Sequence, residues 1–134
     1  MGQQQLLLLV LGAIIVGVAI VVGVNMFSTS AINANRDAVV QDCMTLATRA
    51  QQWYRTPTIL GGGGHLFTAI TLTKIRFPQT NENGTFSFED VQDDSIQIKG
   101  VGTEPGADAG EVTIWVTPDH IRAPQFAAGW YTGT

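Results

Sequence analysis

The N-terminal part of the chain carries one unbroken apolar segment. Residues 6–24 read LLLLVLGAIIVGVAIVVGV, nineteen positions without a charged or polar side chain. As an α-helix this segment would extend about 28 Å, which matches the hydrocarbon core of a bilayer. A domain of this size could hardly surround a helix that is apolar on every face. The pattern therefore predicts a helix that is compatible with a membrane.

Residues 27–56 carry apolar side chains on one side only of the helix that they are expected to form. After Phe27, apolar residues recur every three or four positions, which is typical of one face of an amphipathic helix. They are Ile32, Val39, Val40, Cys43, Met44, Leu46, Ala47, Ala50, Trp53 and Tyr54. Pro57 ends the segment, because the residue before a proline is disfavoured in the α region. We expect one helix over residues 3–56, apolar over 3–26 and amphipathic over 27–56, roughly 50 residues and about 75 Å long.

A cleaved signal peptide is the alternative interpretation of the apolar segment. Thr29-Ser30-Ala31 could serve as a small-residue cleavage site. The preceding MGQQQ contains no Lys or Arg, however, and the apolar run exceeds the usual length of a signal peptide's hydrophobic region. The helical pattern also continues past the possible site. These features favour a helix that is retained.

The second half of the chain has the period of β-strands. Asn83-Gly84 predicts a two-residue hairpin turn, followed by a strand over Thr85–Phe88. Residues 95–101 and 111–116 alternate between apolar and polar, and turn formers separate them, so they should pair as a hairpin. We expect residues 66–77 to be helical at first and extended later.

These elements predict an α+β fold in which the long N-terminal helix packs on a small antiparallel β-sheet head. The sheet needs a cover, and the apolar stripe of the helix is the natural one. The residues expected to pack the helix on the head are Val39, Val40, Cys43, Leu46, Ala47, Ala50, Trp53 and Tyr54. Residues 57–65 contain Gly61–Gly64 and are expected to form a flexible linker, and residues 66–134 the head. The tail, residues 124–134, should pack on its own sheet, with a contact to a neighbouring subunit as the alternative.

Charge limits the possible functions. Residues 56–134 hold four bases and nine acids, a net charge of −5, and Lys and Arg form no cluster along the sequence. A nucleic-acid partner is therefore not expected, because phosphate contacts need clustered bases. The single cysteine, Cys43, excludes an intramolecular disulfide and a multi-Cys zinc site. His65 and His120 lie 55 residues apart, without a Cys or carboxylate at ligand spacing around both, so a structural metal is not expected.

No pattern indicates an enzyme or a cofactor. Several acids could suit a calcium ion if the loops brought them together, although acids in such loops are usually only solvated. They are Glu89, Asp90, Asp93, Asp94, Asp108 and Glu111. Cys43 falls on the apolar stripe, where a buried structural thiol is expected. No Gly-Lys-Ser/Thr follows the four glycines, so they do not form a P-loop.

Small residues interrupt the apolar segment. They are Gly12, Ala13, Gly17, Ala19 and Gly23, and two small-x-x-x-small pairs occur among them, Ala13 with Gly17 and Ala19 with Gly23. Such pairs let helix backbones approach closely. The alternative is that glycine is simply common in membrane helices. The first interpretation predicts that these helices pack against one another.

The complete layout resembles the type IV pilin superfamily. It combines a very short leader that ends in Gly2, about 20 apolar residues, an amphipathic continuation to about residue 55 and a β-rich head. The resemblance implies a precursor in the inner membrane that is cut after Gly2, so that Gln3 becomes the new N-terminus. It also implies a helical homo-oligomer, an extracellular filament whose core is formed by the apolar helices.

The chain departs from the family at two positions. Leu7 stands where a typical bacterial pilin has Glu, and Gln3 stands where it has Phe. Assembly then uses another device, such as the amides of residues 3–5, or the leader is not processed in the usual way. The expected function is a structural subunit of a pilus-like filament. The alternatives are a monomeric, single-pass tethered domain with a binding or accessory role, and a secreted binding module.

Overall fold

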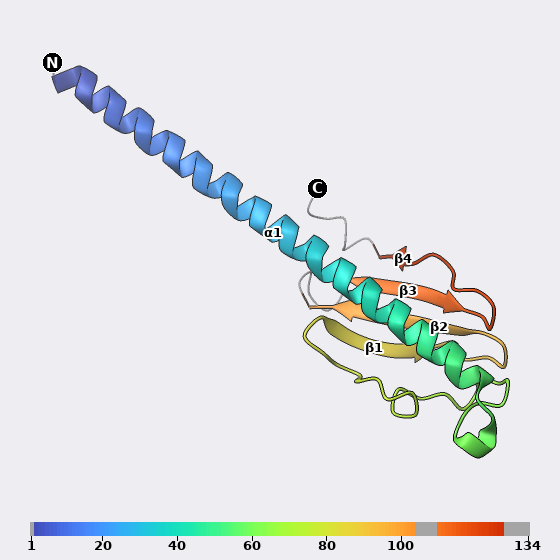
Figure 1. The fold of residues 1–134 in the computed structure, drawn as a ribbon. Coiled ribbons are helices and arrows are strands. Elements are labelled where there is room, and N and C mark those ends of the chain that lie inside the picture. Colours follow the sequence, from blue (N-terminus) through green and yellow to red (C-terminus); the bar gives the residue numbers. More distant parts are fainter. Residues whose placement is uncertain (1, 104–109, 128–134) are drawn as a thin grey trace.

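The computed structural model describes residues 2–103 and 110–127 of the chain. It has the predicted α+β fold, one long helix lying against a four-stranded antiparallel sheet (Figure 1). The elements are α1 (Gly2–Arg55), the 3-10 turn η1 (Thr58–Leu60), β1 (Gly84–Glu89), β2 (Ile96–Gly102), β3 (Glu111–Val116) and β4 (Gln125–Phe126).

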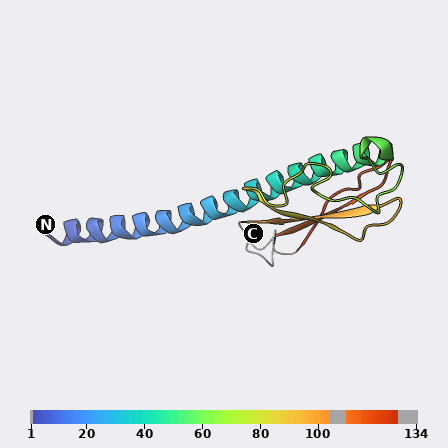
Figure 2. The same cartoon turned by 90° about the horizontal axis from the view of Figure 1, so that it is seen from below.

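The helix α1 is continuous from the apolar half to the amphipathic half. Its N-terminal half extends away from the rest of the molecule, and its C-terminal half lies along one face of the sheet, mainly over β2 and β3 (Figures 1 and 2). The helix ends at Arg55, two residues before Pro57, where the sequence predicts its end within one residue.

The sheet has the strand order β1-β2-β3-β4 with every neighbouring pair antiparallel. The predicted hairpin between β2 and β3 is confirmed, and Ile98 lies opposite Ile114 in its register. Both side chains are fully buried, and burial alternates along the two strands, as the period of two requires. One face of the sheet therefore forms the core with the helix. β4 was not predicted from the sequence.

The segment between residues 66 and 77 differs from its prediction. It contains neither a helix nor a strand and is a succession of turns. Four of its apolar side chains, Phe67, Ile70, Ile75 and Phe77, are nevertheless buried in the core. Because the chain is irregular here, the spacing of these buried side chains follows neither the period of a helix nor that of a strand.

The turn before β1 is also longer than predicted. Thr80 bridges Thr85, so the loop spans residues 81–84 and not only Asn83-Gly84. The side-chain oxygen of Asn81 accepts hydrogen bonds from the backbone N–H groups of Asn83 and Gly84, at 2.8 and 3.0 Å. An asparagine that binds the backbone two residues later is a known turn former, and it sets the turn type here.

The Gly-rich segment folds back onto the end of α1 in place of the expected flexible linker. The backbone N–H groups of Gly63, Gly64 and His65 donate to the carbonyls of Trp53, Thr56 and Tyr54. These carbonyls belong to the last turn of the helix and its flank, where carbonyl groups have no partner within a helix. Gly61 takes a left-handed backbone conformation with φ 86°, which glycine adopts without strain.

Phe126 of the tail is partly buried against the core, as packing of the tail on its own sheet requires. Trp130 and Tyr131, also expected to contribute, lie outside the described residues, and so does Asp108 of the possible calcium cluster.

Candidate assembly surface

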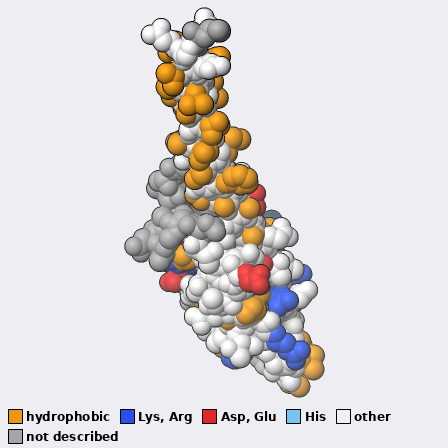
Figure 3. Space-filling view, turned by 90° about the vertical axis from the view of Figure 1, so that its left-hand side faces the viewer, with side chains coloured by type: hydrophobic (Ala, Val, Ile, Leu, Met, Phe, Trp, Pro, Cys, Tyr) orange, Lys and Arg blue, Asp and Glu red, His pale blue; other side chains and the backbone are white. Residues whose placement is uncertain are grey.

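The apolar half of α1 is left uncovered by the described part of the chain. Every large apolar side chain from Leu6 to Phe27 is exposed, with exposed fractions between 50% and 80%. Figure 3 shows hydrophobic side chains along the whole projecting helix, whereas acidic and basic side chains lie on the head. By length and composition the helix can cross a membrane, and none of its most apolar part is buried. The exposed helix indicates insertion into a membrane or packing against other chains.

The small residues of this half are accessible. Gly12, Ala13, Gly17 and Ala19 are exposed, and Gly23 is half-buried. A Cβ atom built on any of the three glycines meets no atom within 4 Å. Nothing in the described chain therefore requires a glycine there. A requirement for small residues would have to come from a neighbouring molecule.

The two small-residue pairs lie on different sides of the helix. Ala13 and Gly17 are four residues apart and share one side, as do Ala19 and Gly23. Ala19 lies six positions after Ala13, which is a rotation of about 600° around the helix axis at 100° per residue. This rotation is about 120° short of two full turns, so the two pairs face directions roughly 120° apart. The helix therefore carries small residues on two different sides.

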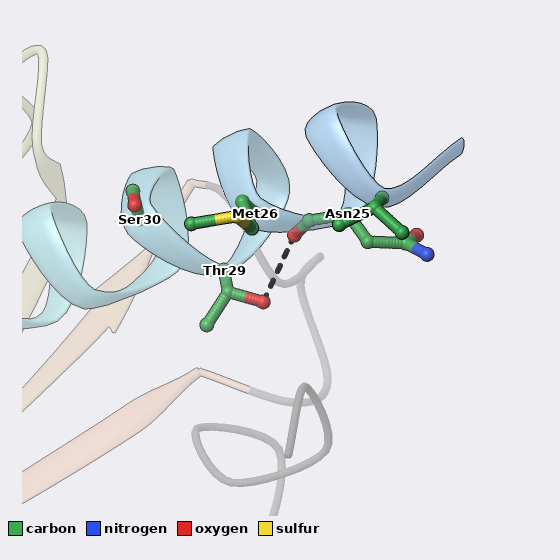
Figure 4. A pocket seen from close by; sticks show the side chains of 5 residues that line it. Asn25, Met26, Thr29 and Ser30 are labelled. Atoms are coloured by element: carbon green, nitrogen blue, oxygen red, sulfur yellow. Dashed lines mark hydrogen bonds between the residues drawn. The ribbon is translucent and has the colours of Figure 1, made fainter. Parts of the chain in front are cut away.

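A polar boundary separates the two halves of the helix. Figure 4 shows Asn25, Met26, Thr29 and Ser30 along one shallow hollow of about 360 Å³. The Thr29 hydroxyl donates to the Asn25 carbonyl at 3.0 Å, so this hydroxyl has an acceptor even in apolar surroundings. The described residues that line this hollow are all uncharged.

The proposed cleavage position lies within regular helix. Gly2 is the first residue of α1, Gln3 follows it, and Leu7 stands about one turn later with 69% of its surface exposed. Met1 is outside the described residues. The amides of residues 3–5 therefore stand on the outermost turn of the apolar half.

The residues expected to join helix and head lie at their interface. Six of them are buried in the core, and Val40 and Tyr54 are partly buried against it. The six are Val39, Cys43, Leu46, Ala47, Ala50 and Trp53. Met44, which the periodicity places on the same face, is 37% exposed. The described part of the head is thus packed on the amphipathic half.

Polar contacts that the periodicity did not reveal join the flanks of the helix to the head. Asp42 accepts hydrogen bonds from the side-chain amides of Asn81 and Asn83, at 2.9 and 2.8 Å. The amide of Asn35 donates to the Asn83 carbonyl at 2.8 Å, and Asn35 is buried. The apolar periodicity does not reveal these contacts, because an Asn or Asp in an amphipathic helix usually faces water. The Asn83 side-chain nitrogen, the acceptor atom of a glycosylation sequon, is occupied by Asp42.

Further hydrogen bonds join the last turns of the helix to loops of the head. Gln51 donates to the Thr117 carbonyl and Arg55 to the Pro118 carbonyl, each at 2.9 Å. Together with the contacts of Asn35 and Asp42, they span the full length of the helix–head interface. These contacts orient the helix on the sheet, so the projecting half extends in a defined direction.

The groups considered for catalysis or metal binding are dispersed. Cys43 is buried, and burial, together with the neighbouring Asp42 charge, raises the pKa of its thiol to about 12. A thiol with this pKa is a poor nucleophile at neutral pH. Glu111 pairs with Lys99 at 3.0 Å, which raises the pKa of Lys99. In residues 2–103 and 110–127, no three His, Cys, Asp or Glu side chains are placed to hold a metal ion.

The architecture is pilin-like, a long N-terminal apolar helix packed on a four-stranded antiparallel sheet. No protein-family model, curated protein or solved structure matches the chain.

Proposed function

We propose that this chain is the structural subunit of an extracellular filament similar to a type IV pilus. The precursor resides in the inner membrane, and subunits then polymerise on the cell surface through the apolar half of α1. The observation that carries the proposal is the continuity of one helix, exposed and apolar over its first half and packed into the head over its second.

The exposed side chains supply the driving force for polymerisation. Burial of one Leu, Ile or Val side chain contributes roughly 1.5–3 kcal/mol. Each large apolar side chain from Leu6 to Phe27 is exposed, so together they strongly disfavour an isolated subunit in water. A bilayer can bury them in the precursor and neighbouring helices can bury them in a filament. The acidic heads then remain outside.

Two features favour a filament over a simple membrane tether. A tether does not require the membrane helix to continue without a break into the core of the head, because a loop between them would serve equally well. The two small-residue pairs also face different directions, which suits a helix that contacts neighbours on more than one side. The monomeric tethered domain remains the second candidate, supported by a length that matches a bilayer.

The N-terminal amides supply a substitute for the missing acidic residue. Leu7 has no charge with which to form an ion pair, unlike the Glu that a typical bacterial pilin has at this position, whereas residues 3–5 carry three side-chain amides that both donate and accept hydrogen bonds. Buried amides need partners, so in a filament core they would bond to equivalent groups of adjacent subunits. We infer no catalytic role for the chain.

Separation of surface filaments tests the proposal. Cells that produce the chain are sheared, the filaments are pelleted, and peptides are identified by mass spectrometry, with the detergent-solubilised membrane fraction as the comparison. We expect the chain in the filament pellet and an N-terminal peptide that begins at Gln3. Recovery only from the membrane fraction would refute the polymer and support the tether. A peptide that begins at Ile32 would instead identify a cleaved signal peptide.

A further inference from the structure

Three basic side chains line one open hollow at the C-terminal end of the helix. Arg49 comes from α1, and Lys74 and Arg76 come from the irregular segment before β1. The other residues around this hollow of about 600 Å³ are Gln52, Trp53, Thr56 and Ile75. We call it the basic hollow. Among the described residues no carboxylate lines it, although the protein as a whole is acidic. Figure 3 shows Lys and Arg side chains gathered toward the lower end of the head.

Two of these bases are held in place by neutral groups. Arg49 donates to the Arg76 carbonyl at 2.9 Å, and its guanidinium lies 5.7 Å from the centre of the Phe77 ring. Lys74 donates to the Ala69 carbonyl at 2.7 Å and lies 5.9 Å from the centre of the Trp53 ring. These contacts limit the freedom of the two side chains while leaving their charges in place.

The three charges have no acidic partner in the described part of the chain. Its Lys and Arg ion pairs are those of Arg36, Arg55 and Lys99. Like charges held close together repel one another, so a bound anion would lower the energy of this arrangement. Arg49 and Lys74 are 25 residues apart in the sequence, and only the fold brings them together.

Trp53 contributes an aromatic side chain to the basic hollow. Its side chain is 7% exposed, and its Nε1–H group is buried without an acceptor among the described residues. The opposite edge of the indole, with Cε3 and Cζ3, packs against Gly63. The N–H edge therefore faces away from the Gly-rich turn. Buried donors normally have partners, and this one is closed to solvent, so a ligand in the basic hollow meets the indole ring and not its N–H group.

We propose that the basic hollow binds a phosphate-bearing ligand. A phosphate carries up to two negative charges and several acceptor oxygens, which suits two guanidinium groups and one ammonium group. The hollow is larger than a phosphate group alone, so it has room for a phosphate ester whose organic part lies beside Trp53. The binding groups are side chains, unlike those of a P-loop.

The ligand is not a headgroup of the membrane that holds the same helix. About 25 residues separate the end of the apolar segment from Arg49, which is roughly 37 Å of helix at 1.5 Å per residue. The basic hollow therefore lies well outside that bilayer. The proposal holds for a filament subunit and for a tethered monomer alike, so its test is independent of assembly.

Calorimetric titration of the full chain in a non-ionic detergent tests the proposal. The probes are glycerol 3-phosphate, inorganic phosphate, glycerol and the dicarboxylate malonate, at matched ionic strength. We expect saturable binding of glycerol 3-phosphate and none of glycerol. Equal affinity for inorganic phosphate would identify free phosphate as a sufficient ligand and support the proposal. Equal affinity for malonate, or no saturable binding of either phosphate, would overturn it.

Charge-neutralising variants locate the site. Lys74→Gln and Arg76→Gln should each weaken phosphate binding by about tenfold or more, because each removes a charge-assisted hydrogen bond. Both side chains are exposed, so we expect unchanged thermal unfolding. Arg122→Gln is the matched control, since it removes the same charge from an exposed position outside the hollow. Equal losses in all three variants would show a non-specific charge effect and contradict the assignment.

The Trp53 indole gives a readout that general electrostatics would not change. In the wild-type chain, binding should shift the Nε1–H resonance in a ¹H–¹⁵N spectrum, because the anion changes the charge beside Lys74, which lies 5.9 Å from the centre of the Trp53 ring. In Arg122→Gln the shift should persist. Binding in the calorimeter without any shift of this resonance would exclude Trp53 from the site.

Discussion

At Gly100 the helix and the sheet approach so closely that a side chain has no room. A Cβ atom built there would lie 2.8 Å from both Cys43 Sγ and Val39 Cγ1. Both neighbours are fully buried on α1, and a β-branched residue such as Val39 has little rotamer freedom in a helix. Gly100 is therefore required by the packing distance.

We expect Gly100→Ala to lower the free energy of unfolding by about 1–3 kcal/mol, the usual range for an overpacked core. The combined variant Gly100→Ala with Cys43→Ala should lose less than the sum of the two single variants, because removal of Sγ makes room for the new methyl group. Thermal unfolding of the detergent-solubilised chain, followed by near-UV circular dichroism, measures the effect. Gly12→Ala is the control, since its new Cβ meets nothing. If the loss in the double variant equals the sum of the two single losses, the new methyl group does not clash with Cys43 Sγ.

The Cys43 thiol should resist alkylation in the folded protein. Burial and the charge of Asp42 raise its pKa from an ordinary 9.0 to about 12, so the reactive thiolate is scarce at pH 8. We expect iodoacetamide to label Cys43 only after denaturation, as measured by mass spectrometry. Rapid labelling of the native chain would show that the helix separates from the head.

The same shift makes stability depend on pH. Above pH 9 the unfolded chain loses the thiol proton while the folded chain keeps it, so folding becomes less favourable as pH rises from 9 to 12. Cys43→Ala should remove this part of the dependence. The comparison requires melting temperatures of both chains across that range. Identical pH profiles would contradict the burial of the thiol.

At the scale of elements, the second half of α1 acts both as a cover and as a clamp. Its apolar stripe covers the sheet, while Asp42 on its flank holds the turn before β1 through Asn81 and Asn83. This turn positions Gly84, the first residue of β1. A Cβ atom at Gly84 would collide with the Val101 carbonyl oxygen.

Asp42→Ala should therefore destabilise the head by about 1–3 kcal/mol, because two amides lose their shared acceptor. Thermal unfolding of the full chain checks this value. The exposed Asp37 serves as the matched control, and Asp37→Ala should change stability by less than about 0.5 kcal/mol. If both variants lose similar stability, the cause is the removal of a negative charge from the helix and not the loss of the hydrogen bonds to the turn.

At the scale of the whole molecule, the helix combines a half that packs on the head with a half that no other described residue buries. A substitution at Gly17 can test contacts between subunits separately from folding, because a Cβ atom built there meets no atom of the subunit within 4 Å. Leucine there does not strain the fold and is a better helix former than glycine. Any loss must therefore arise between molecules.

We expect Gly17→Leu to abolish filament recovery from the sheared fraction while the melting temperature of the head stays unchanged. The larger side chain prevents the close approach of neighbouring helices. Val18→Leu, an adjacent exposed position, adds bulk without removing a small residue and should still assemble. Normal filaments from Gly17→Leu would show that close approach at this position is unnecessary.

The sequence alone determined the continuous helix, its change from all-round apolar to one-sided, and the hairpin of β2 with β3. Each follows from local periodicity, which records which side of an element faces away from water. Pro57 likewise ends the helix through a steric effect on its neighbour. The core positions of α1, such as Leu46 and Ala50, belong to the same pattern.

Only the tertiary structure decided where the polar and irregular parts go. The contact of Asp42 with Asn81 and Asn83, the burial of residues such as Phe67 in a segment without regular structure, and the basic hollow each join residues far apart in the sequence. Periodicity says nothing about such pairs, because it depends on spacing along one element and these contacts depend on how elements are placed in space. For the same reason, the sequence determines that the first half of α1 has an apolar surface, but not which molecule packs against that surface.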